Sequence, residues 1–274
     1  INSEICTTKF IMIADPANPT TSRPASTRTA AVIDVGTTSI RMAIADIDDA
    51  GDVHLLSSLS QAVALGKDTF TRGSIEKSTI EECVRVLKSY KRVLAEYGID
   101  RPDQVRVVTT SAVREALNKL SFLDRIYTAT GIQVIPIDEA EVNRVTYLGV
   151  QPLLKADPDL AAARTVITEV GGGSTELLQV QNADVLFAHT YRLGSLRIHQ
   201  TLESYHASHS TTRRLMETQI QRVIDQILQQ VPPGASQEMV VLGGDMRFAA
   251  QQLIPDWNPG HLTPIPLSAL EELT

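Results

Sequence analysis

Residues 168–178 read TEVGGGSTELL, in which three consecutive glycines separate two strand-like runs. An acidic residue, Glu169, stands two positions ahead of the glycines. Glycine lets the backbone adopt positive φ and brings its N–H groups close to a ligand, because no Cβ intervenes. The stretch therefore predicts a strand, a tight glycine turn and a second strand, with the turn as a candidate anion-binding loop.

A second stretch with the same order of residue types lies 135 residues earlier in the chain. There, Asp34-Val-Gly-Thr-Thr-Ser39 ends the apolar run AAVIDVG, as Glu169-Val-Gly-Gly-Gly-Ser174 ends TVITEVG. Each stretch opens a series of strand patterns with period 2 followed by helical patterns with period 3.6. The repeat predicts two α/β lobes whose glycine loops face each other across a cleft.

The lobes are expected at residues 30–150 and 151–274. Residues 1–29 are rich in Pro, Ser, Thr and Ala and predict a disordered leader. A helix scarcely begins before Thr274, so we expect that the C-terminal part of the second lobe is missing.

Composition narrows the class of protein. The 274 residues are 43% apolar and 21% charged, and no run approaches the ~20 apolar residues of a membrane span. A formal charge of −7 argues against a broad nucleic-acid-binding face. Cys6 and Cys83 lack the spacing of a zinc or disulfide framework, which favours a cytoplasmic location.

Both loops combine backbone N–H groups with hydroxyl side chains, the donors that suit phosphate oxygens. The candidate phosphate-binding residues are Gly36, Thr37, Thr38, Ser39, Gly171, Gly172, Gly173, Ser174 and Thr175. Asp34 and Glu169 end strands beside these loops, where a phosphate would repel a bare carboxylate. A divalent cation or a water between carboxylate and phosphate would remove that repulsion, so both are candidate metal-binding residues.

Several segments resemble, in order, those of the Ppx/GppA family of exopolyphosphatases and guanosine pentaphosphate phosphohydrolases, in the actin, hexokinase and sugar-kinase superfamily. The segments are AAVIDVGTTSIRMAIADI (30–47), VVTTSAVREALN (107–118), VITEVGGGSTELLQV (166–180), LGSLRIHQ (193–200) and VVLGGDMRFAA (240–250). The second glycine loop carries the most specific match.

The resemblance implies two actin-like (ribonuclease H-like) lobes, each a mixed five-stranded sheet with flanking helices, and an active-site cleft between them. It also implies hydrolysis of a terminal phosphoanhydride of inorganic polyphosphate or guanosine pentaphosphate, and a homodimer. Mg²⁺ or another divalent cation would neutralise the leaving phosphate, and a glutamate would act as base. Glu176 would order the metal or the nucleophilic water, unless it is only a solvated strand residue.

Two positions depart from the family pattern. The family's second loop begins with Asp where this chain has Glu169. The family's S-G-x-E-E-A-R segment, whose second Glu is taken as the base, is replaced by PIDEAEVNR. Counting back from Arg144 puts Val142 at the base position beside Glu141, whereas counting forward from the preceding strand favours Glu139.

Three alternatives therefore stay open. The chain is a hydrolase that uses Glu141 or Glu139, or a phosphate- or alarmone-binding protein of the same fold without turnover. The first loop alone is also similar to that of sugar kinases. Arg114, in the second segment, can reach phosphate from a helix start or simply be exposed.

Overall fold

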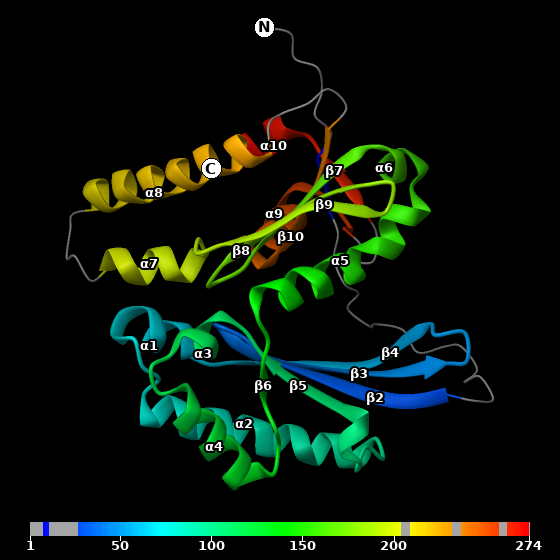
Figure 1. Ribbon diagram of the computed structural model, residues 1–274, viewed down its shortest axis with the longest axis vertical. Helices are drawn as coiled ribbons and strands as arrows, with labels where there is room; N and C mark the ends of the chain where they lie inside the picture. Colours follow the sequence, from blue (N-terminus) through cyan, green and yellow to red (C-terminus); the bar gives the residue numbers. More distant parts are fainter. Residues whose placement is uncertain (1–7, 11–26, 204–208, 232–236, 258–261, 274) are drawn as a thin grey trace, which may run out of the picture. The chain divides into compact units, whose positions relative to one another are not determined.

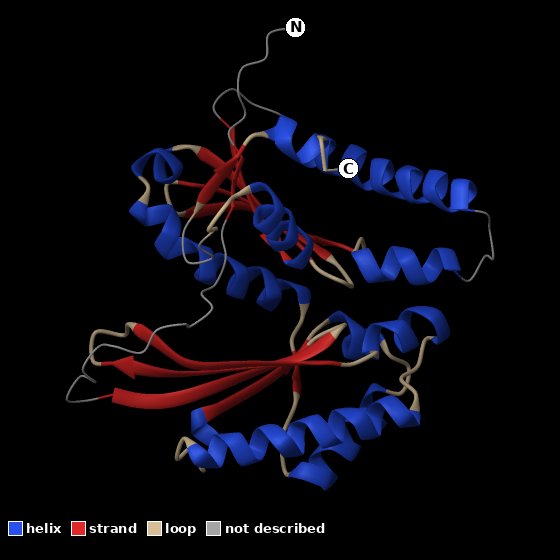
Figure 2. Cartoon of the chain, turned by 180° about the vertical axis from the view of Figure 1, so that it is seen from behind, coloured by secondary structure: helices blue, strands red, loops and turns tan. Residues whose placement is uncertain are grey.

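The computed structural model describes residues 8–10, 27–203, 209–231, 237–257 and 262–273. Two compact units make up the chain: the first unit is Asp15–Asp138, and the second unit is Glu139–Thr274 together with Ile1–Ala14 (Figure 1). Each unit is built on one mixed β-sheet with packed helices (Figure 2). Within the described residues, no helix is both long enough and apolar enough to cross a bilayer.

The first unit has a five-stranded sheet in the order β4-β3-β2-β5-β6, as far as the described residues go. Its strands are β2 (Thr27–Val35), β3 (Ser39–Asp48), β4 (Val53–Ala62), β5 (Val105–Thr109) and β6 (Ile135–Pro136). Its helices are α1 (Leu65–Arg72), α2 (Lys77–Glu96), the 3-10 turn η1 (Pro102–Gln104), α3 (Ser111–Glu115) and α4 (Lys119–Thr130). Only β3 runs against the other four strands.

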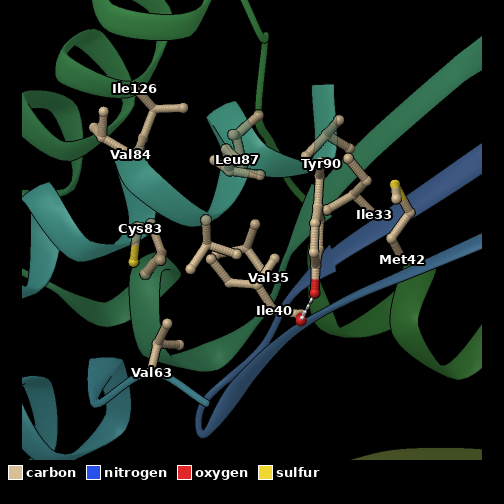
Figure 3. Close-up of a cluster of buried hydrophobic side chains, with 14 of the residues drawn as sticks. Ile33, Val35, Ile40, Met42, Val63, Cys83, Val84, Leu87, Tyr90 and Ile126 are labelled. Atoms are coloured by element: carbon tan, nitrogen blue, oxygen red, sulfur yellow. Dashed lines mark hydrogen bonds between the residues drawn. The ribbon is translucent and has the colours of Figure 1, made fainter. Parts of the chain in front are cut away.

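The core of the first unit follows from the alternation in β2 and β3. Ile33 and Val35 in β2, like Ile40 in β3, are fully buried on the face that α2 and α4 cover (Figure 3). Tyr90 of α2 reaches the same face and donates its hydroxyl to the Ile40 carbonyl at 2.8 Å. Burial raises the pKa of the Tyr90 phenol and that of the Cys83 thiol, the latter to about 12.

The second unit has a six-stranded sheet, again among described residues, in the order β11-β1-β10-β7-β8-β9. Its strands are β1 (Thr8–Phe10), β7 (Arg164–Val170), β8 (Thr175–Gln181), β9 (Asp184–Tyr191), β10 (Gln237–Gly243) and β11 (Thr263–Ile265). Its helices are α5 (Glu139–Ala156), α6 (Pro158–Ala162), α7 (Ser195–Glu203), α8 (His209–Gln230), α9 (Gly244–Leu253) and α10 (Leu267–Glu271). The run β9-β8-β7-β10 has the order and directions of β4-β3-β2-β5, so the predicted repeat is confirmed.

Helices cover both faces of the second sheet. Val150 and Leu154 of α5 pack with Ile167 and Leu178 on one face. On the opposite face, Leu177 packs with apolar residues that include two from α8. Because neighbouring residues of a strand point to opposite faces, residues 167, 169, 176 and 178 all belong to the α5 face.

Two expected boundaries differ in the structure. The units divide after Asp138 rather than after residue 150, because α5 buries its apolar residues on the second sheet. Chain order does not tell which sheet a connecting helix will cover. Within the segment expected to be a leader, β2 already begins at Thr27, and Thr8–Phe10 forms β1 beside β10. The other residues of 1–26 lie outside the described part of the chain.

The alternation in β2 can be tested by truncating neighbouring residues. Ile33 is fully buried, whereas Val32, on the opposite face, is 50% exposed. We expect Ile33→Ala to lower the free energy of unfolding by about 2–5 kcal/mol, because it leaves a cavity in the core. Val32→Ala should cost less than about 1 kcal/mol. Urea unfolding followed by circular dichroism measures both, and equal losses would contradict this register.

Candidate functional site

The first loop joins β2 to β3, and backbone N–H groups hold its carbonyls in place. The N–H of Gly36 donates to the Ser39 carbonyl at 3.0 Å and closes the turn. The Thr37 carbonyl accepts a hydrogen bond of 2.8 Å from the N–H of Gly66 in α1, and the Thr38 carbonyl one of 2.9 Å from Val63, just before that helix. Hydrogen bonds to its carbonyl oxygens thus fix the conformation of this loop.

Several side chains of the predicted phosphate site lie around the first loop. Asp34, the second-last residue of β2, is half-buried, and its carboxylate would lie 3.5 Å from a Cβ placed on Gly36. Thr37 is buried, with its hydroxyl oxygen 3.5 Å from that of Ser111. Ser39 accepts a hydrogen bond from Arg41 at 3.1 Å. The acid and two hydroxyls therefore surround one turn.

Arg114 lies in α3, directly after β5 of the first unit. Its Nη1 donates to the carbonyl of Ile137 at 3.0 Å, and the residue is half-buried. The guanidinium therefore stabilises the chain between β6 and α5. A phosphate contact by Arg114 stays a prediction.

The second loop joins β7 to β8, and the first turn of α7 holds its carbonyls. Within the loop, the N–H of Gly171 donates to the Ser174 carbonyl at 2.9 Å. The Gly171 carbonyl accepts from Ser195 N–H at 3.1 Å, and the next two glycine carbonyls accept from Arg197, through its N–H (2.9 Å) and its Nε (2.6 Å). Three consecutive carbonyls are thus directed to α7.

The N–H groups of both loops have a different environment from the carbonyls. Within the described part of the chain, no group accepts a hydrogen bond from the N–H of Gly172 or Gly173. The same holds for Thr37 and Thr38 in the first loop. Consecutive N–H groups without internal acceptors form an anion-binding concavity. Each loop therefore offers donors to a phosphate.

Close backbone contacts explain two glycines beyond those of the loop. A Cβ on Gly194 would lie 2.5 Å from backbone atoms of Gly173 and 2.6 Å from Gly172. Gly243, at the end of β10, has φ +122°, and its Cβ would lie 2.4 Å from the Val170 carbonyl oxygen. Only glycine fits at either position, so the second loop is enclosed by backbone on two sides.

Two glutamates face each other across β7 and β8 at the base of the second loop. Glu169 and Glu176 are directly paired in the antiparallel register and so share the α5 face. Glu176 is 5% exposed and accepts a 2.7 Å hydrogen bond from Ser174 Oγ. Glu169 accepts one of 3.0 Å from Thr146 of α5. Like charges placed opposite one another are destabilising, and a cation between them would relieve this.

Asn143 of α5 lies against the same strand pair. It is 6% exposed, and its Nδ2 donates to Thr190 Oγ1 at 3.1 Å. Thr190 is the register partner of Glu176 on β9. The Asn143 Oδ1 is buried without a hydrogen-bond donor among the described residues. A buried acceptor of this kind is costly unless a proton donor or cation satisfies it.

The oxygen ligands of this cluster suit a divalent cation. Mg²⁺ prefers hard oxygen ligands and usually takes one or two carboxylates, completing its shell with water and substrate phosphates. Glu169 and Glu176 supply such a pair. Among described residues, no group of three His, Cys, Asp or Glu is close enough to hold a metal alone. Water or phosphate oxygens would complete the shell of a cation bound there.

Comparison with known proteins decides the family. The model of the Ppx/GppA phosphatase family matches residues 43–253. This chain belongs to the Ppx/GppA phosphatase family. It is 28% identical over 270 residues to exopolyphosphatase 2 of Mycobacterium tuberculosis, covering 91% of this chain and 79% of that protein.

Two further relatives support the family and its fold. Exopolyphosphatase 1 of Mycobacterium leprae is 25% identical over 167 residues, which are 61% of this chain; the match spans less than half, 47%, of that relative. The crystal structure of the Aquifex aeolicus Ppx/GppA member superposes with a TM-score of 0.66 at 26% identity, covering 85% of this chain and 72% of that one. The predicted actin-like α/β fold is confirmed.

The acids expected to replace the Ppx/GppA base lie in the first turn of α5. Glu139 is its first residue and is exposed. Glu141 accepts two hydrogen bonds of 2.7 Å from Arg144, and this carboxylate raises the pKa of the guanidinium above its ordinary value. Val142, which counting back from Arg144 puts at the family's base position, is half-buried. A carboxylate held on both oxygens by a guanidinium is a poor proton acceptor.

The hydroxyl of Thr175 has a partner other than phosphate. It is buried on the face opposite Glu176 and donates to the Leu193 carbonyl. Similarly, Ser174 donates to Glu176 rather than pointing away from the protein. The expected phosphate contacts of this loop thus rest on its N–H groups.

Residue patterns did not single out Gly194, Arg197, Asn143 or Thr146 as site residues. The segment LGSLRIHQ carried a signal, because it matched a family segment, but nothing in its spacing indicated contact with the second loop. Asn143 and Thr146 are three residues apart on one helical face, a spacing equally typical of an exposed stripe. Their roles become visible only when α5 is placed on the second sheet.

The tight contact at Gly194 yields a test with opposite signs at two glycines. Gly194→Ala forces a Cβ into the backbone of the second loop, so we expect a loss of about 1–3 kcal/mol in the free energy of unfolding. Gly149→Ala, in α5, meets no atom within 4 Å and should stabilise by about 0.5–1 kcal/mol. Thermal unfolding of both variants measures this, and a neutral Gly194→Ala would refute the contact.

Proposed function

We propose that this chain is a divalent-cation-dependent hydrolase that removes the terminal phosphate of inorganic polyphosphate or guanosine pentaphosphate. The observation that supports it is the second loop. Its carbonyls are held by α7, and two facing glutamates stand at its base. No residue that the structure describes accepts a hydrogen bond from the N–H of Gly172 or Gly173. Donors for a phosphate and ligands for a cation thus adjoin within one unit.

Each part of the loop has a chemical task in this proposal. The N–H groups of Gly172 and Gly173 bind and orient phosphate oxygens. Glu169 and Glu176 would hold Mg²⁺, which when bound would neutralise charge on the leaving phosphate. Phosphoryl transfer depends chiefly on such positioning and charge stabilisation. In the first unit, the N–H groups of Thr37 and Thr38 offer a second set of donors, and Asp34 is the predicted metal ligand there.

Ser174 and Thr146 have supporting roles. Each donates a hydrogen bond to one of the two facing glutamates, at 2.7 and 3.0 Å. A hydroxyl that donates to a carboxylate oxygen fixes the rotamer of that side chain, and so the position of a metal ligand. Such outer partners usually change metal affinity or activity by about 10- to 100-fold when removed.

Release of orthophosphate tests the proposed function. The purified chain with Mg²⁺ should release orthophosphate from long-chain polyphosphate or from guanosine pentaphosphate, and EDTA should abolish release. Glu176→Gln keeps the size of the side chain but removes its charge, so we expect kcat/KM to fall at least about 10-fold. Glu217→Gln, on the exposed α8 surface, should leave it unchanged.

The proposed hydrolase activity is refuted if a chain that circular dichroism shows to be folded releases no orthophosphate from either substrate with Mg²⁺ or Mn²⁺. Equal rates for the chain and Glu176→Gln would instead contradict the role of the facing glutamates.

A second candidate is a phosphate- or alarmone-binding protein of this fold with weakened turnover. One observation at the start of α5 favours it: Glu141 is held on both oxygens by Arg144. The count back from Arg144, which puts Val142 at the base position, agrees with it. The binding loops do not depend on either residue. If this candidate holds, binding is tight, and neither Glu139→Gln nor Glu141→Gln changes the slow rate of hydrolysis.

Restoring a carboxylate distinguishes the two candidates. If the chain lacks a base, Val142→Glu should raise kcat by about 10²–10⁴-fold, the usual contribution of a positioned base. Val145→Glu adds the same charge one turn further along α5, at a residue that is 50% exposed, and should leave kcat unchanged. Single-turnover release of orthophosphate measures both. An unchanged rate for Val142→Glu would show that another group already acts as base.

A further inference from the structure

The first turn of α7 determines which way three peptide groups of the second loop point. In a trans peptide, the carbonyl of one residue and the N–H of the next point in opposite directions. The carbonyls of residues 171, 172 and 173 point to Ser195 or Arg197. The N–H groups of Gly172, Gly173 and Ser174 must therefore point away from α7, together and on one side.

Arg197 supplies two of the three donors that hold these carbonyls. Its main-chain N–H lies 2.9 Å from the Gly172 carbonyl, and its Nε lies 2.6 Å from that of Gly173. The Nε bond is short and comes from a charged group, and charge-assisted hydrogen bonds are about twice as strong as neutral ones. The side chain is half-buried, so water competes with it only in part.

A loop of three glycines needs such an external restraint. Glycine has no Cβ, so the Gly172–Gly173 peptide can rotate at low cost, and the Gly173–Ser174 peptide is not restricted by a side chain on its glycine side. Rotation of the Gly173–Ser174 peptide would turn a carbonyl toward the phosphate in place of an N–H. The contact at Gly194 limits the space for this motion, but among the described residues only Arg197 Nε holds the last carbonyl of the three.

We propose that Arg197 is a positioning residue, which holds the N–H groups of Gly173 and Ser174 toward a bound phosphate through the carbonyls behind them. This inference rests on the phosphate-binding role proposed for the second loop. It assigns to Arg197 an action through the loop backbone rather than through its own charge on the ligand.

Binding of inorganic phosphate tests this action without turnover. Arg197→Lys keeps the positive charge but lacks the Nε that reaches the Gly173 carbonyl, so the two side chains are not equivalent here. By titration calorimetry with Mg²⁺ present, we expect Arg197→Lys and Arg197→Ala to weaken phosphate binding similarly, by about tenfold or more. Arg192→Lys, at an exposed residue of the same connection, should bind as the unaltered chain does.

Chemical rescue and hydrogen exchange separate positioning from folding. Millimolar guanidinium chloride should restore phosphate binding to Arg197→Ala, whereas equal sodium chloride should not. Amide exchange of residues 168–178 should become faster in Arg197→Lys while the strands of the first unit are unaffected. A merely structural role would lower the melting temperature and leave phosphate affinity per folded molecule unchanged.

Two results overturn the inference, and they differ from failure of the proposed function. Arg197→Lys that binds phosphate as tightly as the unaltered chain shows that charge alone is sufficient. Arg197→Ala with unchanged exchange at 168–178 shows that the loop needs no restraint. A different result refutes only the hydrolase: the unaltered chain binds phosphate, both Arg197 variants bind it more weakly, and the unaltered chain releases no orthophosphate from any substrate.

Discussion

The planarity of the trans peptide is the constraint on which the second loop depends. It couples each carbonyl to the N–H that follows, so the group that binds the carbonyls also decides which donors face a ligand. Here that group is the first turn of α7, which approaches the loop closely because Gly194, directly before the helix, carries no Cβ. Gly194 thus admits the helix that orients the peptides of TEVGGGSTELL.

The facing glutamates place a second constraint on this site. Burying Glu176 beside Glu169 costs free energy, since both carboxylates lose water and repel one another. Hydrogen bonds from Ser174 and Thr146 offset part of that cost. Because Thr146 belongs to α5, the Glu169 side chain connects β7 to this helix directly. The position of α5 and that of the Glu169 carboxylate are therefore coupled.

Local patterns were sufficient for what local physics controls. Alternation in β2 and β3 predicted the buried face that holds Ile33 and Ile40, and the repeated acid-x-Gly-x-x-Ser order predicted two related sheets. Contacts between segments that are distant in the chain produce no such pattern in the sequence. The strand Thr8–Phe10 pairs with β10 more than 200 residues away, and α5 covers a sheet most of whose strands follow the helix in the chain. For the same reason, Arg197 could be matched to a family segment but not to the carbonyls it binds.

The rotation of α5 bears on which acid can assist hydrolysis. Asn143 and Thr146 define the helical face that contacts the second sheet, by their bonds to Thr190 and Glu169. Glu139 precedes Asn143 by four residues, one helical turn, and therefore lies within about 40° of that face. Glu141 is two residues from Asn143, about 200° around the helix, where Arg144 binds it. The helix thus directs Glu139, not Glu141, to the side of the facing glutamates, which favours the count from the preceding strand that puts the base at Glu139.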